Sequence, residues 1–218
     1  MLSWFKSGHC ERNPDIVWPS RAAKWSGLRE AVEGAATEGV PVLIVAHFPD
    51  TFDEVQKNLK TAGAVFPTEL RQPVDAQPQA VLTMAASFAA GFSAPMLDRL
   101  WIVAAERHPL RAREKPIVDF AASLPFPTQL ALYASLDEPL FVHCGVSKTL
   151  PLLRKVGMDE HSAIENPLLS RAIANAQQVL AKNCRTDRPA RSAEEWMTLN
   201  APPSPAPERA LPPGVKKI

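Results

Sequence analysis

Three basic side chains follow one apolar run in this chain. Arg107 and His108 come shortly after the run Leu-Trp-Ile-Val-Ala at residues 100–104, and Arg111 stands three residues beyond His108. If the run is a parallel strand, its carboxyl end lies at the edge where α/β sheets bind ligands. The three side chains would then bind an anion such as a phosphate. The alternative is an ion pair of Arg107 with Glu106 beside solvated helix charges; we favour it, because surface charge clusters often contribute little.

A phosphate loop is the usual partner of such cations in nucleotide-binding proteins. Its backbone amides and its lysine neutralise the phosphates of the bound nucleotide. This sequence has no Gly-x-x-x-x-Gly-Lys-Ser/Thr motif, and its 9 glycines are dispersed along the chain. The sequence therefore predicts no nucleotide cofactor.

The histidines and cysteines do not have the spacing of a metal site. His9-Cys10 and His143-Cys144 are adjacent pairs, without the Cys-x-x-Cys or His-x-x-x-His spacing of tetrahedral zinc. Three widely spaced cysteines also give no disulfide framework. We expect no metal and a buried, unreactive Cys144. His47 ends a second apolar run, where it either faces a ligand or is a hydrogen-bonded structural group.

The bulk composition is that of one globular domain with a tail. Of 218 residues, 46% are apolar and 22% charged, and the net charge is +1. That balance predicts no nucleic-acid-binding face. No run approaches the roughly 18 apolar residues of a membrane span, and Met1 to Lys6 lack the order of a signal peptide. We therefore expect no membrane insertion, no nucleic-acid partner and a cytoplasmic protein.

The apolar pattern alternates between strands and helices. Predicted strands are residues 15–18, 40–46, 80–84, 100–104 and 130–133; predicted helices are residues 22–37, 52–62, 111–123, 147–156, 166–182 and 193–199. Ser20 is a good helix N-cap, and Gly39 and Gly63 stand where helices end. Strands without polar alternation are typical of a parallel sheet covered on both faces, so the pattern predicts an α/β fold.

Several motifs in the second half carry a resemblance to one family. In order they are residues 100–108, 134–140, 153–159, 163–167 and 170–177, the last reading Ser-Arg-Ala-Ile-Ala-Asn-Ala-Gln. Their order and spacing resemble the second RecA-like ATPase domain of the SecA preprotein translocase, running into the start of its helical scaffold. Weaker similarity extends the match to roughly residues 15–183. The resemblance implies a RecA-like fold of the P-loop NTPase type, with a parallel sheet flanked by helices and a C-terminal helical extension.

The arginines that complete the ATP site of that family are missing here. The family's Gln-Leu-Arg-Gly-Arg-x-Gly-Arg-Gln-Gly falls without a gap on residues 116–125, so its three arginines meet Val118, Phe120 and Ser123. Its Gly-Arg-Gly-Thr-Asp element meets residues 89–93, Ala-Ala-Gly-Phe-Ser. Arg111 does match an arginine of the family's pattern. A site for buried phosphate charge needs paired cations, so the sequence predicts a protein that is not an enzyme.

Together these observations predict three segments and a function. Residues 1–14 form an N-terminal extension, residues 15–200 the SecA-like domain with its C-terminal helices, and residues 201–218 a proline-rich tail, which is either solvated or a docking motif. The leading hypothesis is a catalytically inactive motor-domain relative that binds a protein, either an ATPase or a translocase component. Four aromatics in the former nucleotide region would line that surface: Phe88, Phe92, Phe120 and Phe126. The alternative is a nucleotide- or phosphate-binding protein with a repurposed site at the strand ends.

Overall fold

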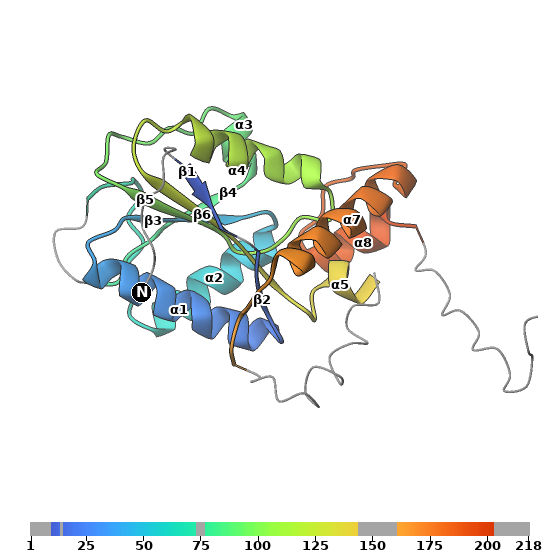
Figure 1. Cartoon of the computed structure of the whole chain (residues 1–218), viewed down its shortest axis with the longest axis horizontal. Helices are drawn as coiled ribbons and strands as arrows, with labels where there is room; N and C mark the ends of the chain where they lie inside the picture. The colour runs from blue at the N-terminus through green and yellow to red at the C-terminus, as the bar shows by residue number, and fades with distance from the viewer. Residues whose placement is uncertain (1–9, 14, 73–76, 144–160, 203–218) are drawn as a thin grey trace, which may run out of the picture.

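Seven strands form one mostly parallel sheet in the computed structural model, which describes residues 10–13, 15–72, 77–143 and 161–202 (Figure 1). The strand order is β4-β3-β5-β6-β2-β7, with β1 also paired to β6. Every pairing is parallel except that of β7 with β2. The strands are β1 (Cys10–Arg12), β2 (Ile16–Trp18), β3 (Val42–Ala46), β4 (Val81–Met84), β5 (Leu100–Ala104), β6 (Thr128–Ser135) and β7 (Ile164–Glu165).

Two short strands share one edge of β6. Cys10 of β1 pairs with Thr128 at the start of β6, and Ile16 of β2 pairs with Tyr133 near its end. The two strands therefore lie one after the other along the same side of β6, and β7 pairs with the other side of β2. Sequence analysis did not expect β1, because the period-2 alternation of a strand cannot be recognised over three residues.

Helices cover both faces of the sheet (Figure 1). The helices α1 (Arg21–Thr37) and α2 (Pro49–Thr61) pack on one face, whereas α3 (Ala86–Ala89) and α4 (Arg111–Ser123) pack on the other. Alternate residues of β3 divide between the two cores: Ile44 packs with the α1 side and Leu43 with the α4 side. All five residues of β3 are buried, which explains why its sequence shows no polar alternation.

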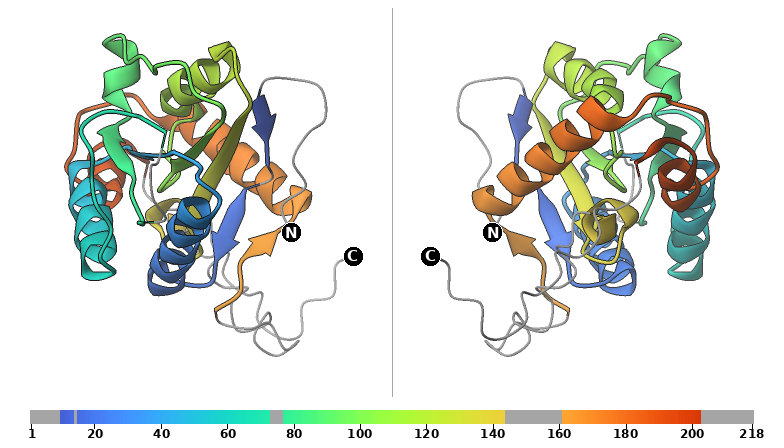
Figure 2. Two further views of the ribbon diagram at one scale, coloured as in Figure 1. Left: turned by 90° about the vertical axis from the view of Figure 1, so that its left-hand side faces the viewer. Right: turned by 90° about the vertical axis from the view of Figure 1, so that its right-hand side faces the viewer.

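Three further helices gather at the carboxyl end of the sheet: α5 (Pro139–His143), α7 (Pro167–Asn183) and α8 (Ala193–Asn200). In both views of Figure 2, β7 continues into α7, which lies beside the edge formed by β1 and β2. The backbone N–H of Asp15 donates to Ser170 of α7 at 2.9 Å, which fixes this position. The C-terminal helices therefore cover the strand ends where ligands of α/β folds are found.

The α/β fold expected from the sequence, a mostly parallel sheet flanked by helices, is confirmed. Ser20 caps α1 by accepting from the Ala23 N–H at 3.2 Å, and Gly39 and Gly63 have the positive φ angles of helix-ending glycines. The predicted helix at residues 147–156 and nearly all of the tail lie outside the described residues. Among the residues that are described, no helix has both the length and the apolar character that a bilayer crossing requires.

Candidate functional site

The carboxyl ends of β3 and β5 bring two polar segments together. His47 and Phe48 follow β3, and the tripeptide Glu106-Arg107-His108 follows β5. Helix α8 packs over them, because Trp196 contacts the His108 ring at a centroid distance of 5.3 Å. Phe48 stacks on the same ring at a centroid distance of 5.2 Å. This edge of the sheet is the expected site, and its side chains decide what it can bind.

The Arg107 guanidinium forms ion pairs and hydrogen bonds with buried side chains of the same chain. Its Nε and Nη2 donate to the two carboxylate oxygens of Glu114 at 2.7 Å each, and its Nη1 donates to Asp15. Gln177 of α7 accepts a further hydrogen bond at 3.3 Å. All four side chains are buried. The expected pairing of Arg107 with Glu106 is therefore wrong, and the guanidinium has no free edge for an anion.

Glu106 has a different structural role. Its carboxylate accepts hydrogen bonds from the backbone N–H groups of His47 and Phe48 at 3.0 Å each and from the Thr51 hydroxyl at 2.7 Å. The side chain thus fixes the turn from β3 into α2. Burial raises the pKa of Glu106 to about 7, although these hydrogen bonds favour its charged form.

The two histidines at this edge are neutral; His108 is buried, and His47 is half-buried. His108 accepts from the Leu110 N–H through Nδ1 at 2.9 Å, and its ring meets that of His47 at 5.3 Å. Burial lowers the pKa of each histidine to about 3. The His47 Nε2 is buried without a hydrogen-bond partner among the described residues. The His47 ring is therefore not a fully hydrogen-bonded structural group among the described residues. His47 lines a hollow of about 330 Å³ with Phe48 and Trp196, and its contact with a ligand stays a prediction.

These pKa shifts predict an acid-sensitive fold. Between pH 6.5 and 3 the unfolded chain protonates both histidines while the folded chain keeps them neutral, so unfolding free energy falls as pH falls. Glu106 acts oppositely, because the folded chain holds its proton up to about pH 7 and that contribution is lost as pH rises. The destabilisation on acidification from the two histidines is larger than the opposite effect of the one carboxyl group. Urea midpoints at several pH values should fall on acidification.

The double variant His47→Asn, His108→Asn isolates the histidine contribution. Asparagine at position 108 keeps an acceptor for the Leu110 N–H, and neither asparagine titrates. Between pH 6.5 and 4.5 we expect the slope to change sign relative to the unmodified chain, because the raised pKa of Glu106 then acts alone and the variant gains stability as pH falls. An unchanged slope would assign the acid sensitivity to other groups.

Lys24 and Glu138 form a second buried pair close to the same edge. The Lys24 Nζ lies 2.5 Å from Glu138 Oε1 and donates to the Ala105 carbonyl at 2.8 Å. Both side chains are under 7% exposed. The pair ties α1 to the start of α5 and leaves this lysine unable to contact a phosphate.

Arg111 lies apart from the other two predicted site residues. It is exposed at the first position of α4 and lines a separate groove of about 650 Å³, together with Arg185 and residues of α7. Arg107 and His108 are buried behind Glu114 and Phe48. The structure therefore does not bring Arg107, His108 and Arg111 together into one anion site.

The four predicted surface aromatics lie mainly within the fold. Phe126 is only 4% exposed, so the prediction that it lines a partner surface is wrong. Phe88, Phe92 and Phe120 form a cluster with ring centroids 4.9–5.5 Å apart, partly buried against the core between α3 and α4. These rings gain more from contact with one another than they would from exposure to water.

Comparison with known proteins points to one family. The chain is 26% identical over 180 residues to the protein translocase subunit SecA of Oleidesulfovibrio alaskensis, covering 76% of this chain and 21% of that protein. It is also 26% identical over 186 residues to SecA of Clostridium beijerinckii, covering 78% and 22%. The chain is similar to SecA at low identity over about three quarters of its own length. No protein-family model matches it.

Solved structures give weaker likenesses to this SecA-like chain. The C-terminal part of the Fun30 ATPase domain superposes with a TM-score of 0.41 at 11% identity, covering 72% of this chain and 52% of that one. The C-terminal domain of a possible DNA helicase from Lactobacillus plantarum gives 0.39 at 14% identity, covering 56% and 73%. The SecA-like chain itself spans about a fifth of the length of the curated relatives it matches.

Sequence reasoning missed the partners that decide the site: Asp15, Glu114 and Gln177. Gln177 donates to the His108 carbonyl at 2.7 Å and to Glu114 at 2.9 Å, joining α7 to the strand end. The sequence did contain one indication against the pairing of Arg107 with Glu106. The side chains of neighbouring residues in an extended segment point in opposite directions, so these two side chains were poorly placed to pair with each other.

Proposed function

We propose that this chain is a SecA-like motor domain that does not hydrolyse ATP and acts by binding another protein. The relatives are subunits of a protein translocase, and the chain matches about a fifth of their length. A domain of this kind would act on a complete motor or on another translocase component. Its relationship to SecA supports a role connected with protein export.

The observation that carries the proposal is the chemistry of α4. The resemblance described above implies arginines at three positions of α4 that are Val118, Phe120 and Ser123 in this chain. Val118 and Phe120 pack against the core of the sheet, and the Ser123 hydroxyl donates to the Phe120 carbonyl at 2.8 Å. Arginines that stabilise a transferred phosphoryl group raise its rate by roughly 10³–10⁵. A helix face of these residues offers no such charge.

The partner surface is best placed on the outer face of α7. Leu168 and Val179 are 68% and 59% exposed, far more than the clustered phenylalanines. Both lie on the helix whose other face holds Gln177 against the strand end. Exposed apolar side chains on a rigid helix are suited to contact another protein.

One experiment tests both parts of this proposal. The purified chain should turn over no ATP above the buffer background, and calorimetry with about 1 mM Mg-ATP or ADP should give no binding heat. Added to complete SecA from the same cells, the chain should change the motor's ATPase rate in a saturable way. The double variant Leu168→Asp, Val179→Asp should lose that effect, because two charges would have to be desolvated in the interface.

Two outcomes would count against it. Binding of ATP, ADP or inorganic phosphate that weakens on replacing Arg111 with alanine would support the ligand-binding alternative instead. An unchanged SecA rate at saturating concentrations of the chain would remove the regulatory role. Arg171→Asp, on the same helix, is the charge control for the α7 variant.

A further inference from the structure

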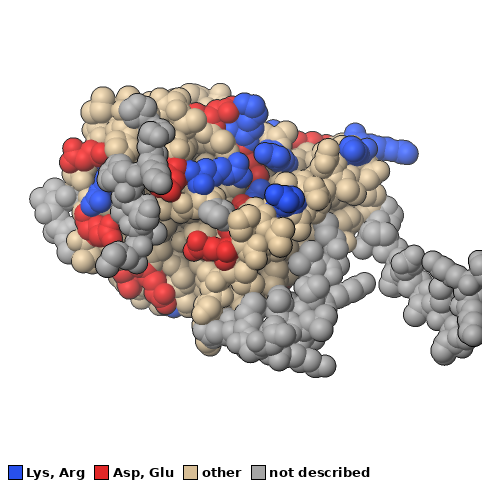
Figure 3. All heavy atoms as spheres, viewed as in Figure 1, with Lys and Arg blue, Asp and Glu red and all other residues tan. Residues whose placement is uncertain are grey.

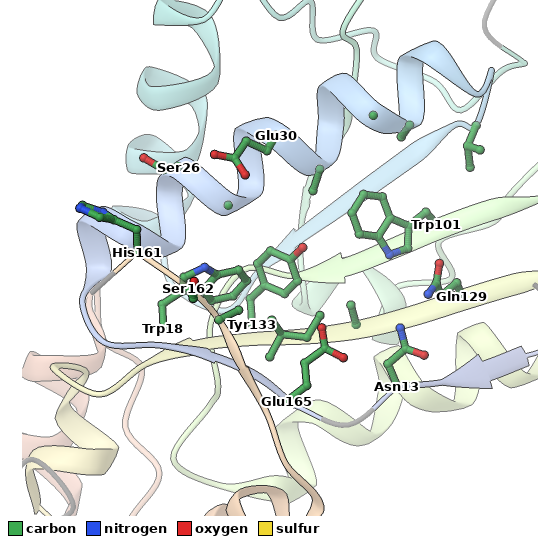
Figure 4. Close-up of a pocket in the computed structure, with 18 of the residues that line it drawn as sticks. Asn13, Trp18, Ser26, Glu30, Trp101, Gln129, Tyr133, His161, Ser162 and Glu165 are labelled. Atoms are coloured by element: carbon green, nitrogen blue, oxygen red, sulfur yellow. The ribbon is translucent and has the colours of Figure 1, made fainter. Parts of the chain in front are cut away.

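A cavity of about 840 Å³ lies between α1 and the sheet, on the face opposite α4. Its floor is formed by β5 and β6, one wall by α1, and the other by β2 and the segment leading into β7 (Figure 4). Side chains that line it include Trp18, Glu30, Trp101, Gln129, Tyr133 and Glu165. Cavities of roughly 300–1,000 Å³ are the usual size of small-molecule sites.

The sequence of α1 creates this space. Gly27 and Gly34, which have no side chain, and Ala31, which has only a methyl group, line the cavity at helical spacing. The two glycines differ in their surroundings. A Cβ at Gly27 would lie 2.6 Å from the Trp18 ring, so Gly27 lets Trp18 pack against the helix, whereas a Cβ at Gly34 would meet nothing within 4 Å. The volume beside Gly34 is therefore open.

The charged groups around the cavity are carboxylates. Glu30 on α1 and Glu165 on β7 lie on opposite sides of Tyr133 (Figure 4), and neither has an ion-pair partner in the part of the chain that is described. Glu38 also lines the cavity, 3.9 Å from Arg99. None of the described lining residues is Lys or Arg, and His161 is the one imidazole. In Figure 3 acidic side chains predominate over the α1 side, and basic ones gather toward α4 and α7.

The uncharged groups add an apolar floor and one unsatisfied donor. The rings of Trp18 and Tyr133 meet at a centroid distance of 4.4 Å. At the other end the indole nitrogen of Trp101 faces Gln129 (Figure 4), yet this buried N–H has no hydrogen-bond partner among the described residues. A buried donor left unpaired costs free energy, which a ligand acceptor would recover.

We propose that this cavity binds an organic cation with a flat, apolar body. Its positive group would lie between Glu30 and Glu165, its body over Tyr133 and Ala131, and a carbonyl or hydroxyl acceptor would reach the Trp101 N–H. Aromatic faces and carboxylates both attract cations, and the same carboxylates repel phosphates and nucleotides. The site is separate from the strand ends and does not depend on the function proposed above.

Three probes of similar size and shape test the effect of ligand charge on binding: the cation benzamidinium, the neutral benzamide and the anion benzoate. Binding is followed by the indole N–H signals of the tryptophans in two-dimensional NMR, with Trp101→Phe assigning the signal of Trp101. We expect benzamidinium to bind with a Kd of about 1 mM, as a fragment of its size allows, followed by benzamide and then benzoate. Trp196 lies in α8, away from the cavity, and its indole N–H donates to Asp187 at 2.9 Å. The N–H signal of Trp196 should therefore not shift.

Two variants locate the site, and a third controls for helix charge. Gly34→Leu should abolish binding because its side chain fills the cavity, and the variant should fold, because leucine favours a helix and the Cβ meets no neighbour. The double variant Glu30→Gln, Glu165→Gln should weaken benzamidinium about 5–10-fold without affecting benzamide. Glu33→Gln, on the same helix but outside the cavity lining, should leave both affinities unchanged.

Equal affinity for benzoate and benzamidinium would overturn the proposal, as would full binding by a folded Gly34→Leu chain. A Trp101 signal that moves with none of the probes at 10-fold above the expected Kd would overturn it as well. None of these results would alter the ATPase test, so the two proposals fail separately.

Discussion

Replacing Arg107 with methionine is expected to lower the free energy of unfolding by about 3–5 kcal/mol. The side chains of Arg107, Asp15 and Glu114 are each under 5% exposed, and the arginine is the cation that both carboxylates contact. Methionine keeps much of the volume but leaves two buried carboxylates without a cation. Urea unfolding at pH 7 followed by circular dichroism measures the loss.

Arg113→Met is the matched control for this variant. Arg113 pairs with Asp187 but its side chain is 57% exposed, so water screens the pair and its loss should cost less than about 1 kcal/mol. Adding Asp15→Asn and Glu114→Gln to Arg107→Met should restore part of the stability by neutralising the stranded charges. If Arg107→Met and Arg113→Met cost the same, the buried network does not hold α4 and α7 to the sheet.

Truncating Trp196 to alanine should cost a similar amount, about 3–5 kcal/mol. The side chain is 1% exposed and packs with Phe48 and His108, so its removal leaves a cavity between α8 and the strand ends. It also removes the 2.9 Å hydrogen bond from its indole to Asp187. The measurement is the unfolding free energy in urea, with far-UV circular dichroism to confirm that the variant folds.

Leu199→Ala in the same helix is the control, because it also places alanine in α8 but removes a side chain that is 40% exposed. Its loss should cost about 1 kcal/mol or less of unfolding free energy. Comparable losses for both variants would mean that α8 is not anchored through Trp196. A large loss for Trp196→Ala alone would place α8 in the cooperative unit of the sheet.

The order of elements was predictable because its signals are local. Predicted and observed bounds agree at β5 and α4, and the cap at Ser20 and the glycine at position 39 mark the two ends of α1. A strand buried on both faces, or a helix with one apolar face, can be recognised from the hydrophobic pattern of a short window of residues.

The candidate site was only partly predictable. Sequence analysis placed Arg107 and His108 at a strand end, which is where they lie, but it gave Arg107 the wrong partner. The phenylalanines were expected at the surface because their positions correspond to a nucleotide site. In the fold the three on α3, α4 and the segment between these helices contact one another instead.

The sequence by itself determined the alternation of strands and helices, since each element depends on residues that are near neighbours in the chain. Only the tertiary structure decided that Arg107 meets Asp15, 92 positions away, and Gln177, 70 positions away. It also decided that α1 leaves a cavity beside Gly34. Such contacts depend on how helices cross the sheet, which is set by the packing of the whole core and by no local pattern.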